Sequence, residues 1–138
     1  MNFTGKILLV DDEAHIRKFV GLVLKSFCYP TIVEAGDGLA ALEAFGREKP
    51  DLVLLDVNMP NLDGLQILAR LRQLDPEVNV VMLTSLTNRQ TVEECVRLGA
   101  LGYIRKDTPR EEISAQLQRI IQEFLDADAA PETGATPP

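Results

Sequence analysis

The stretch Ile7-Leu8-Leu9-Val10-Asp11-Asp12-Glu13 joins a short apolar run to three consecutive acidic residues. A run of large aliphatic residues between polar neighbours is typical of a strand that is buried on both faces. The acidic residues follow at once, at the carboxyl end of the predicted strand. The stretch therefore predicts a buried sheet with charged groups at one edge.

The same pattern recurs along the chain. Strong apolar runs lie at 52–55 and 80–83, and weaker strand-like runs lie at 31–33 and 102–104. Apolar residues at helical spacing fill the intervals, at 16–24, 39–45, 65–74, 92–98 and 113–124. Strand and helix thus alternate five times, which predicts parallel pairing through right-handed crossovers. We expect an α/β fold: a doubly wound, five-stranded parallel sheet in the order 2-1-3-4-5 with five helices.

The composition indicates one ordinary soluble domain. The chain has 138 residues, of which 46% are hydrophobic and 25% charged, with a net charge of −7. An acidic chain is poorly suited to bind nucleic acid or an anionic membrane directly. The apolar runs are too short to span a bilayer, and the first residues lack the apolar region of a signal peptide. Two cysteines make no disulfide framework, so we expect a cytoplasmic protein.

The last residues differ from the rest in composition. The segment 126–138 holds three of the eight prolines, three acidic residues and no apolar residue larger than alanine. Such a segment cannot recover by burial the entropy that it loses on ordering. We therefore predict a folded domain over residues 1–125 and a disordered, acidic Pro/Ala tail over 126–138. A linker to a further domain would have the same composition.

Polar residues also follow the other predicted strands. Asp56 ends the run at 52–55, Thr84 ends the run at 80–83, and Lys106 comes shortly after the run at 102–104. The carboxyl ends of parallel strands meet at one edge of the sheet, and ligands bind there where the strand order reverses. We expect Asp56 to lie beside Asp11 and Asp12 at this point.

Three neighbouring carboxylates repel one another unless a cation offsets their charge. An all-oxygen site of this kind suits Mg²⁺. The single histidine, His15, has no partners at metal-ligand spacing, which argues against a transition-metal site. A carboxylate, Mg²⁺, a hydroxyl and a lysine are the groups needed to accept a phosphoryl group in an in-line reaction.

These segments resemble the receiver domain of two-component response regulators. The resemblance rests on the stretch 7–13, on Asp56-Val57-Asn58-Met59-Pro60, on Asp63-Gly64, on Thr84-Ser85 and on Lys106. It covers about residues 5–125 and implies a flavodoxin-like fold of the kind found in stand-alone chemotaxis regulators. The combination is more specific than any of the motifs alone.

The resemblance implies that Asp56 is the phosphoacceptor. It further implies that Asp12 binds Mg²⁺ directly, that Asp11 acts through a metal-bound water, and that Asp56 and the backbone carbonyl of Asn58 complete the metal site. One departure from the family is that Asp107, rather than the common proline, follows the lysine. The sequence leaves open whether the Lys106-Asp107 bond is cis or trans.

The same resemblance implies a switch. Lys106 would pair with the phosphoryl group, Thr84 would move to hydrogen-bond it, and Tyr103 would change rotamer in response. Asn58 and Leu86 would frame the path of the hydrolytic water. Because Leu86 cannot hold a water by hydrogen bonding, we expect dephosphorylation to be slower than with a polar residue at this position.

The function predicted is a phosphorylation-controlled signalling switch, not an enzyme. It would accept phosphate on Asp56 from a histidine kinase or a histidine phosphotransfer protein. It would then change the surface formed by 92–98, 102–104 and 113–124, and so act on a downstream protein or on a second copy.

Three alternatives are weighed against this function. A Mg²⁺-dependent aspartyl-phosphate phosphatase would need an acid where Asn58 stands. A flavin-binding protein would need a phosphate loop where the chain has Asp11-Asp12-Glu13. A degenerate receiver that serves only as an interaction module would not need all of the phosphoryl-binding positions filled.

Overall fold

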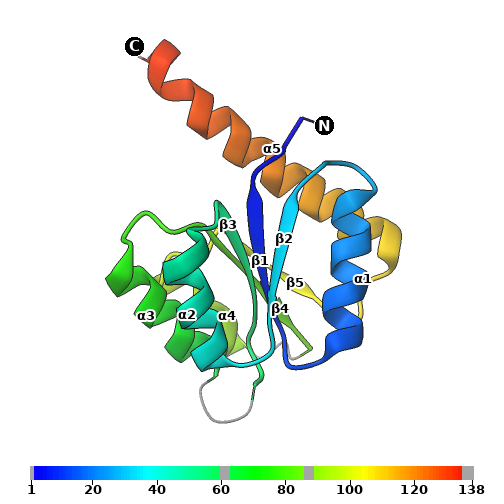
Figure 1. Cartoon of the computed structure of the whole chain (residues 1–138), viewed down its shortest axis with the longest axis vertical. Helices are drawn as coiled ribbons and strands as arrows, with labels where there is room; N and C mark the ends of the chain where they lie inside the picture. The colour runs from blue at the N-terminus through cyan, green and yellow to red at the C-terminus, as the bar shows by residue number, and fades with distance from the viewer. Residues whose placement is uncertain (1, 60–62, 86–88, 135–138) are drawn as a thin grey trace.

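The computed structural model describes residues 2–59, 63–85 and 89–134. The strands are β1 (Lys6–Val10), β2 (Thr31–Ala35), β3 (Leu52–Asp56), β4 (Val80–Thr84) and β5 (Gly102–Arg105). The helices are α1 (Ala14–Lys25), α2 (Gly38–Glu48), α3 (Gly64–Leu74), α4 (Arg89–Arg97) and α5 (Arg110–Gly134). All strand pairs are parallel in the order β2-β1-β3-β4-β5, which confirms the predicted doubly wound α/β fold (Figure 1).

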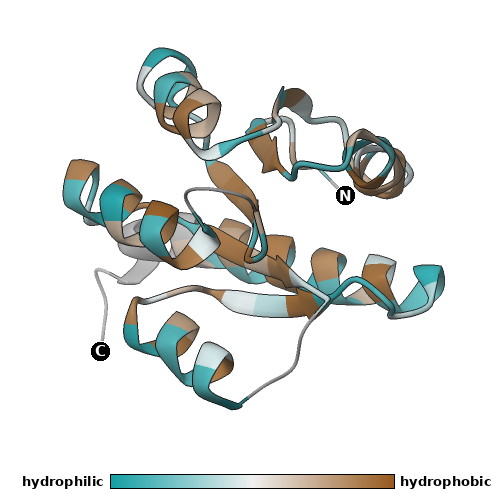
Figure 2. Ribbon diagram, turned by 90° about the horizontal axis from the view of Figure 1, so that it is seen from below, coloured by the Kyte–Doolittle hydropathy of each residue, from teal (hydrophilic) through white to brown (hydrophobic). Residues whose placement is uncertain are grey.

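The sheet separates two hydrophobic clusters. Along β1, Leu8 and Val10 pack with α2, α3 and α4 on one face, whereas Ile7 and Leu9 pack with α1 and α5 on the other. Both faces of the sheet are therefore covered, which is why the central strands have continuous apolar runs instead of alternating ones. Figure 2 shows this distribution, with largely hydrophobic strands in the centre and helices that alternate between hydrophilic and hydrophobic colours.

Side-chain caps fix where two helices begin. Asp37 accepts a hydrogen bond from the backbone N–H of Ala40 at 2.8 Å at the start of α2. Asp63 forms a capping box with Gln66 at the start of α3.

Gly64 brings the start of α3 against the end of β3. Its N–H donates to the carbonyl of Val57 at 2.9 Å, and a Cβ at this position would overlap the backbone carbonyl of Asp56. Only glycine permits so close an approach. The helix is thereby anchored directly beside the last residue of β3.

α5 continues through Gly134 and projects beyond the sheet in Figure 1, while the disordered tail expected over 126–138 stays a prediction. Three of the nine residues over 126–134 are alanines, which have the highest helix propensity. A helix that is already nucleated also extends with one backbone hydrogen bond for each added residue. The assignment of 1–125 as the receiver domain stays a prediction. Within the described residues, no helix is both long and apolar enough to cross a membrane.

Candidate functional site

Backbone hydrogen bonds continue the sheet one residue past three of its strands. The N–H of Asp11 donates to Ala35 O at 3.1 Å, that of Val57 to Leu83 O at 2.9 Å, and that of Lys106 to Thr84 O at 2.8 Å. These bonds fix the backbone at the carboxyl edge, where the predicted site residues lie. The Cα positions from which the site side chains extend are therefore well defined.

Lys106 reaches across this edge to two carboxylates. Its Nζ lies 2.7 Å from Asp11 Oδ2 and 3.1 Å from Asp56 Oδ1, while the more exposed Glu13 Oε1 lies 3.6 Å away. The Lys106 side chain is 12% exposed, and the side chains of Asp11 and Asp56 are buried. One ammonium group is therefore shared by two buried carboxylates.

The second oxygen of Asp56 is the distinctive atom of the site. Asp56 Oδ1 accepts a hydrogen bond from the backbone N–H of Asn58 at 3.1 Å and faces Lys106. Asp56 Oδ2 is buried and has no hydrogen-bond partner among the described residues. Asp11 Oδ2 also lacks an aligned hydrogen bond, but it lies in the ion pair with Lys106. A buried, unpartnered carboxylate oxygen is costly, so Asp56 Oδ2 marks a position for a ligand or a cation.

The electrostatics follow from this crowding. Burial raises the pKa of Asp56 to about 6, and the charge of Asp11 adds to the rise, although Lys106 and the N–H of Asn58 oppose it. Burial alone would lower the pKa of Lys106. Its hydrogen bond to Asp11 and the charges of Asp56 and Asp11 outweigh burial, so that the pKa of Lys106 is raised. The lysine therefore stays charged at neutral pH.

The acidic residues also form a candidate metal site. Carboxylate oxygens of Asp11, Asp12 and Asp56 all lie within 4.8 Å of one another, and Asp12 is on the exposed side of the group. Three carboxylates meet one ammonium, which leaves an excess of negative charge beside the unpartnered Asp56 Oδ2. An all-oxygen, partly exposed donor set fits Mg²⁺, which usually keeps several waters.

The remaining predicted residues lie around this group. Thr84 is buried at the end of β4, and Tyr103 is exposed on β5. Asn58 is exposed, and its Nδ2 donates to Ser85 Oγ at 3.5 Å. Leu86 lies outside the described residues. The structure thus brings together Asp11, Asp12, Asp56 and Lys106, whereas the predicted roles of Thr84, Tyr103, Asn58 and Leu86 stay predictions.

In the loop after β5, an ion pair joins the two residues that flank Lys106. Arg105 Nε and Nη2 donate to the two carboxylate oxygens of Asp107 at 2.9 and 2.6 Å. The N–H of Thr108 also donates to Arg105 O at 3.2 Å, which makes a turn around Lys106 and Asp107. The described residues contain no cis peptide bond, so the Lys106-Asp107 bond is trans.

Two charged residues near the site were missed by the sequence analysis. Arg17, on α1, donates from Nη1 to the backbone carbonyl of Asp11 at 2.5 Å and from Nε to Glu34 Oε1 at 2.8 Å. Glu34 lies opposite Leu9 in the β1–β2 register, so the strand order would have indicated that it is near the carboxyl edge. The position of Arg17 had no comparable signal.

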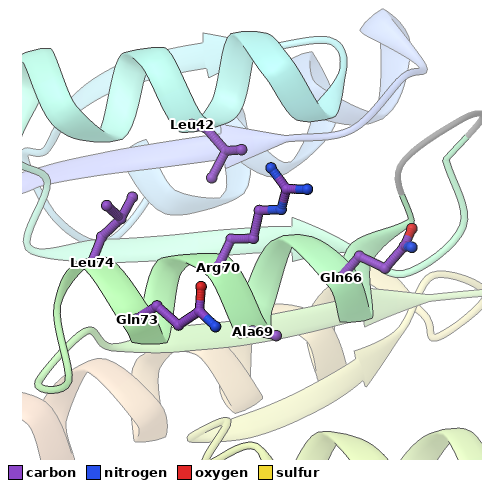
Figure 3. Close-up of a pocket in the computed structure, with 6 residues that line it drawn as sticks. All are labelled: Leu42, Gln66, Ala69, Arg70, Gln73 and Leu74. Carbon is purple, nitrogen blue, oxygen red and sulfur yellow. The ribbon is translucent and has the colours of Figure 1, made fainter.

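A surface hollow between α2 and α3 shares no residue with the acidic group. Figure 3 shows the side chains that line it, which are Leu42, Gln66, Ala69, Arg70, Gln73 and Leu74. None of these residues is a predicted site residue. The carboxyl edge of the sheet therefore remains the candidate site.

Comparison with known proteins agrees with this geometry. The family model for the response regulator receiver domain matches residues 7–118. Sporulation initiation phosphotransferase F of Bacillus subtilis (strain 168) is 35% identical over 116 residues, which are 84% of this chain and 93% of that protein. Chemotaxis protein CheY of Listeria monocytogenes is 31% identical over 114 residues, which are 83% of this chain and 96% of that protein.

A solved structure gives the same result for the fold. The CheX-CheY-BeF3-Mg+2 complex from Borrelia burgdorferi contains a chain with a TM-score of 0.78 and 30% identity, over 86% of this chain and 88% of that chain. Other relatives are longer, and this chain spans only 26% of Regulatory protein AtoC of Escherichia coli (strain K12). With the fold, the acidic group and the family match in agreement, the chain belongs to the response regulator receiver domain family of two-component systems.

Proposed function

We propose that the chain is a phosphorylation-controlled switch in which Asp56 accepts a phosphoryl group from a histidine kinase or a histidine phosphotransfer protein. The observation that carries the proposal is Asp56 Oδ2, a buried carboxylate oxygen without a hydrogen-bond partner among the described residues. The other oxygen of Asp56 is held by Asn58 and Lys106, so Oδ2 is the atom available for reaction.

Asp56 acts as the nucleophile of the proposed reaction. A bond forms between Asp56 Oδ2 and phosphorus, while the bond between phosphorus and the donor imidazole nitrogen breaks. The electron pair of that bond stays on the imidazole nitrogen, which then takes a proton from solvent. A pKa of about 6 leaves Asp56 mostly ionised at neutral pH and thus competent to attack.

The cations around Asp56 balance the incoming charge. Mg²⁺ held by Asp11, Asp12, Asp56 and the carbonyl of Asn58 would neutralise charge on the transferring group. Lys106 already lies 3.1 Å from Asp56 Oδ1, so its ammonium is placed to pair with a phosphoryl oxygen once it leaves Asp11. The related CheY of Borrelia burgdorferi forms a complex with BeF3 and Mg+2, which supports a metal-dependent site of this kind.

The output surface of the proposed switch is formed by α4, β5 and α5. Thr84 ends β4 and its carbonyl accepts the hydrogen bond of Lys106 N–H, so a change at the phosphoryl site reaches β5 directly. Exposed apolar side chains lie on this side of the molecule at Val96, Leu101 and Tyr103. They suit contact with a downstream protein or with a second copy.

We further propose a regulatory role in the cytoplasm. Both cysteines are buried and unpaired, which agrees with a reducing compartment. The chemistry proposed is limited to self-catalysed phosphotransfer onto Asp56 and hydrolysis of the product. Signalling would therefore depend on the lifetime of the phosphorylated form and on its partners.

Phosphotransfer profiling tests this function. Purified histidine kinases and phosphotransfer proteins of the same organism, labelled on histidine, are mixed with the chain and Mg²⁺. We expect rapid transfer from at least one donor to the wild type, none to Asp56→Asn, and normal transfer to the surface control Asp63→Asn. Equal transfer to Asp56→Asn, or no transfer from any donor, would overturn the proposal.

The switch has its own test. Thr84→Ala should still be phosphorylated, because the nucleophile and the cations are intact, but phosphorylation should no longer change the output surface. Backbone amide chemical shifts of α4, β5 and α5 measure this directly. If the shifts of Thr84→Ala change on phosphorylation as those of the wild type do, Thr84 has no part in the switch.

A further inference from the structure

Arg17 ties together three segments beside the acidic group. From the first half of α1 it donates Nη1 to the carbonyl of Asp11 at 2.5 Å and Nε to Glu34 Oε1 at 2.8 Å. Its side chain is only 18% exposed, although it carries a full charge. The contacts therefore link α1, the loop after β1 and the end of β2.

The surrounding backbone leaves room for this guanidinium. A Cβ at Gly36 would lie 3.4 Å from Arg17 Nη1, at van der Waals contact, so the guanidinium packs closely against the backbone at position 36. Next to it, the N–H of Asp11 donates to Ala35 O at 3.1 Å. The backbone of Asp11 is thus held on both sides, through its N–H by β2 and through its carbonyl by Arg17.

The carbonyl of Asp11 belongs to the peptide unit that joins Asp11 to Asp12. Since a peptide unit is planar, holding its oxygen sets the direction in which the chain enters Asp12. Asp12 is exposed, so packing does not fix its side chain. The contact from Arg17 is the one described interaction that constrains this peptide unit at its oxygen.

We propose that Arg17 is a positioning residue for the Mg²⁺ site, which aims the carboxylate of Asp12 at the cation shared with Asp11 and Asp56. This inference rests on the proposed function, because it concerns the same metal site. Glu34 assists by fixing the guanidinium. Residues that orient metal ligands typically change metal affinity by about 10-fold or more when they are mutated.

The sign of the effect separates positioning from simple charge. A guanidinium near the site repels a divalent cation, so removing the charge alone would tighten Mg²⁺ binding. Loss of positioning would weaken binding instead. Arg17→Lys keeps the charge, but an ammonium cannot donate to Asp11 O and Glu34 with the planar geometry of a guanidinium. This variant therefore tests the geometry of the contact without changing the charge.

The experiment measures the Mg²⁺ dissociation constant of the unphosphorylated, chelator-treated full chain by calorimetric titration. Arg17→Gln should raise Kd by about 10-fold, and Arg17→Lys should raise it by at least about threefold. Glu34→Gln should raise Kd by about twofold. Lys18→Gln, which removes an exposed charge from the next position, should leave Kd unchanged or slightly lower. At saturating Mg²⁺, the phosphorylation rate of Arg17→Lys with acetyl phosphate should stay within twofold of wild type.

The outcomes distinguish this inference from the proposed function. If the wild type and Asp12→Ala differ in Mg²⁺ binding but Arg17→Gln binds as tightly as wild type or more tightly, the positioning role is wrong and the metal site stands. If the wild type itself binds no Mg²⁺ at millimolar concentrations, the proposed metal site fails and the inference fails with it. Should Arg17→Gln not fold, unchanged Kd values in both Arg17→Lys and Glu34→Gln would overturn the inference.

Discussion

A long cationic side chain lies at each end of the strands, but one has neutral hydrogen-bond partners and the other has charged partners. At the amino ends of β4 and β5, Arg72 donates four hydrogen bonds of 2.8–3.2 Å to the backbone carbonyls of Pro76, Val78, Leu98 and Gly99. At the carboxyl edge, Lys106 is shared between the buried carboxylates of Asp11 and Asp56.

The difference separates a structural site from the proposed phosphoacceptor site. Arg72 has neutral partners that remain in place, so its contacts tie the end of α3 to the loops before β4 and β5. Lys106 has charged partners that repel each other, and Asp56 Oδ2 remains without a hydrogen-bond partner in the described part of the chain. The amino edge therefore stabilises the fold, whereas the carboxyl edge gives up stability to keep the carboxylate that we propose as the phosphoacceptor.

The largest effect is expected at the amino edge. Arg72→Met keeps much of the apolar stem but leaves four carbonyls without this donor, so the free energy of unfolding should fall by about 3 kcal/mol. Arg70→Met is the control, because Arg70 is exposed on the same helix. Urea unfolding measures both variants. If Arg72→Met lowers the free energy of unfolding no more than Arg70→Met does, the four hydrogen bonds of Arg72 contribute little to stability.

An effect of opposite sign is expected at the carboxyl edge. The pKa of Asp56 is raised to about 6, so between its ordinary value and 6 the folded state binds more protons than the unfolded state. Stability contributed by this group is therefore lost as pH rises through that window. Without Mg²⁺, Asp56→Asn should be more stable than wild type by on the order of 2 kcal/mol at pH 7.

The pH dependence gives the control for Asp56→Asn. The gain should shrink as pH falls through 6 towards 4, because Asp56 of the wild type then becomes protonated. Asp63→Asn, an exposed replacement of the same kind, should show no such trend. An Asp56→Asn variant that is less stable than wild type at pH 7 would mean that the carboxylate contributes favourable contacts.

A smaller effect is expected from Mg²⁺ itself. If the metal relieves the repulsion, it should stabilise the unphosphorylated wild type by about 1.4 kcal/mol at ten times Kd. Asp12→Ala should lose most of this gain, whereas Asp37→Asn, at an exposed cap on the same edge, should keep it. Thermal unfolding with and without Mg²⁺ measures the gain, and an equal gain in Asp12→Ala would remove Asp12 from the site.

The sequence predicted the features of the carboxyl edge that depend on the topology of the sheet. Asp11, Asp12, Asp56 and Lys106 each follow a recognisable strand, and parallel strands bring their carboxyl ends to one edge. Predicting that these residues meet requires only the positions of the strands in the sequence and their order in the sheet. Four of the predicted site residues therefore meet in the structure as expected.

The contacts of the long cationic side chains could not be predicted in the same way. Arg72 and Arg17 bond to backbone carbonyls, and every residue carries a carbonyl, so no residue type marks the acceptor. The sequence analysis also did not predict that α5 extends through Gly134. Proline and acidic residues dominated the composition of 126–138, whereas the preceding packed helix favours continued helix formation.

The central claim is that Asp56 is the phosphoacceptor, and its most direct test is the site of modification. The chain is incubated with acetyl phosphate and Mg²⁺, its intact mass is measured, and the acyl phosphate is reduced with borohydride for peptide mapping. We expect one phosphoryl group on the wild type, located at residue 56, and none on Asp56→Asn or in the presence of a chelator. Equal incorporation into Asp56→Asn, or a modified residue other than 56 in the wild type, would contradict the account.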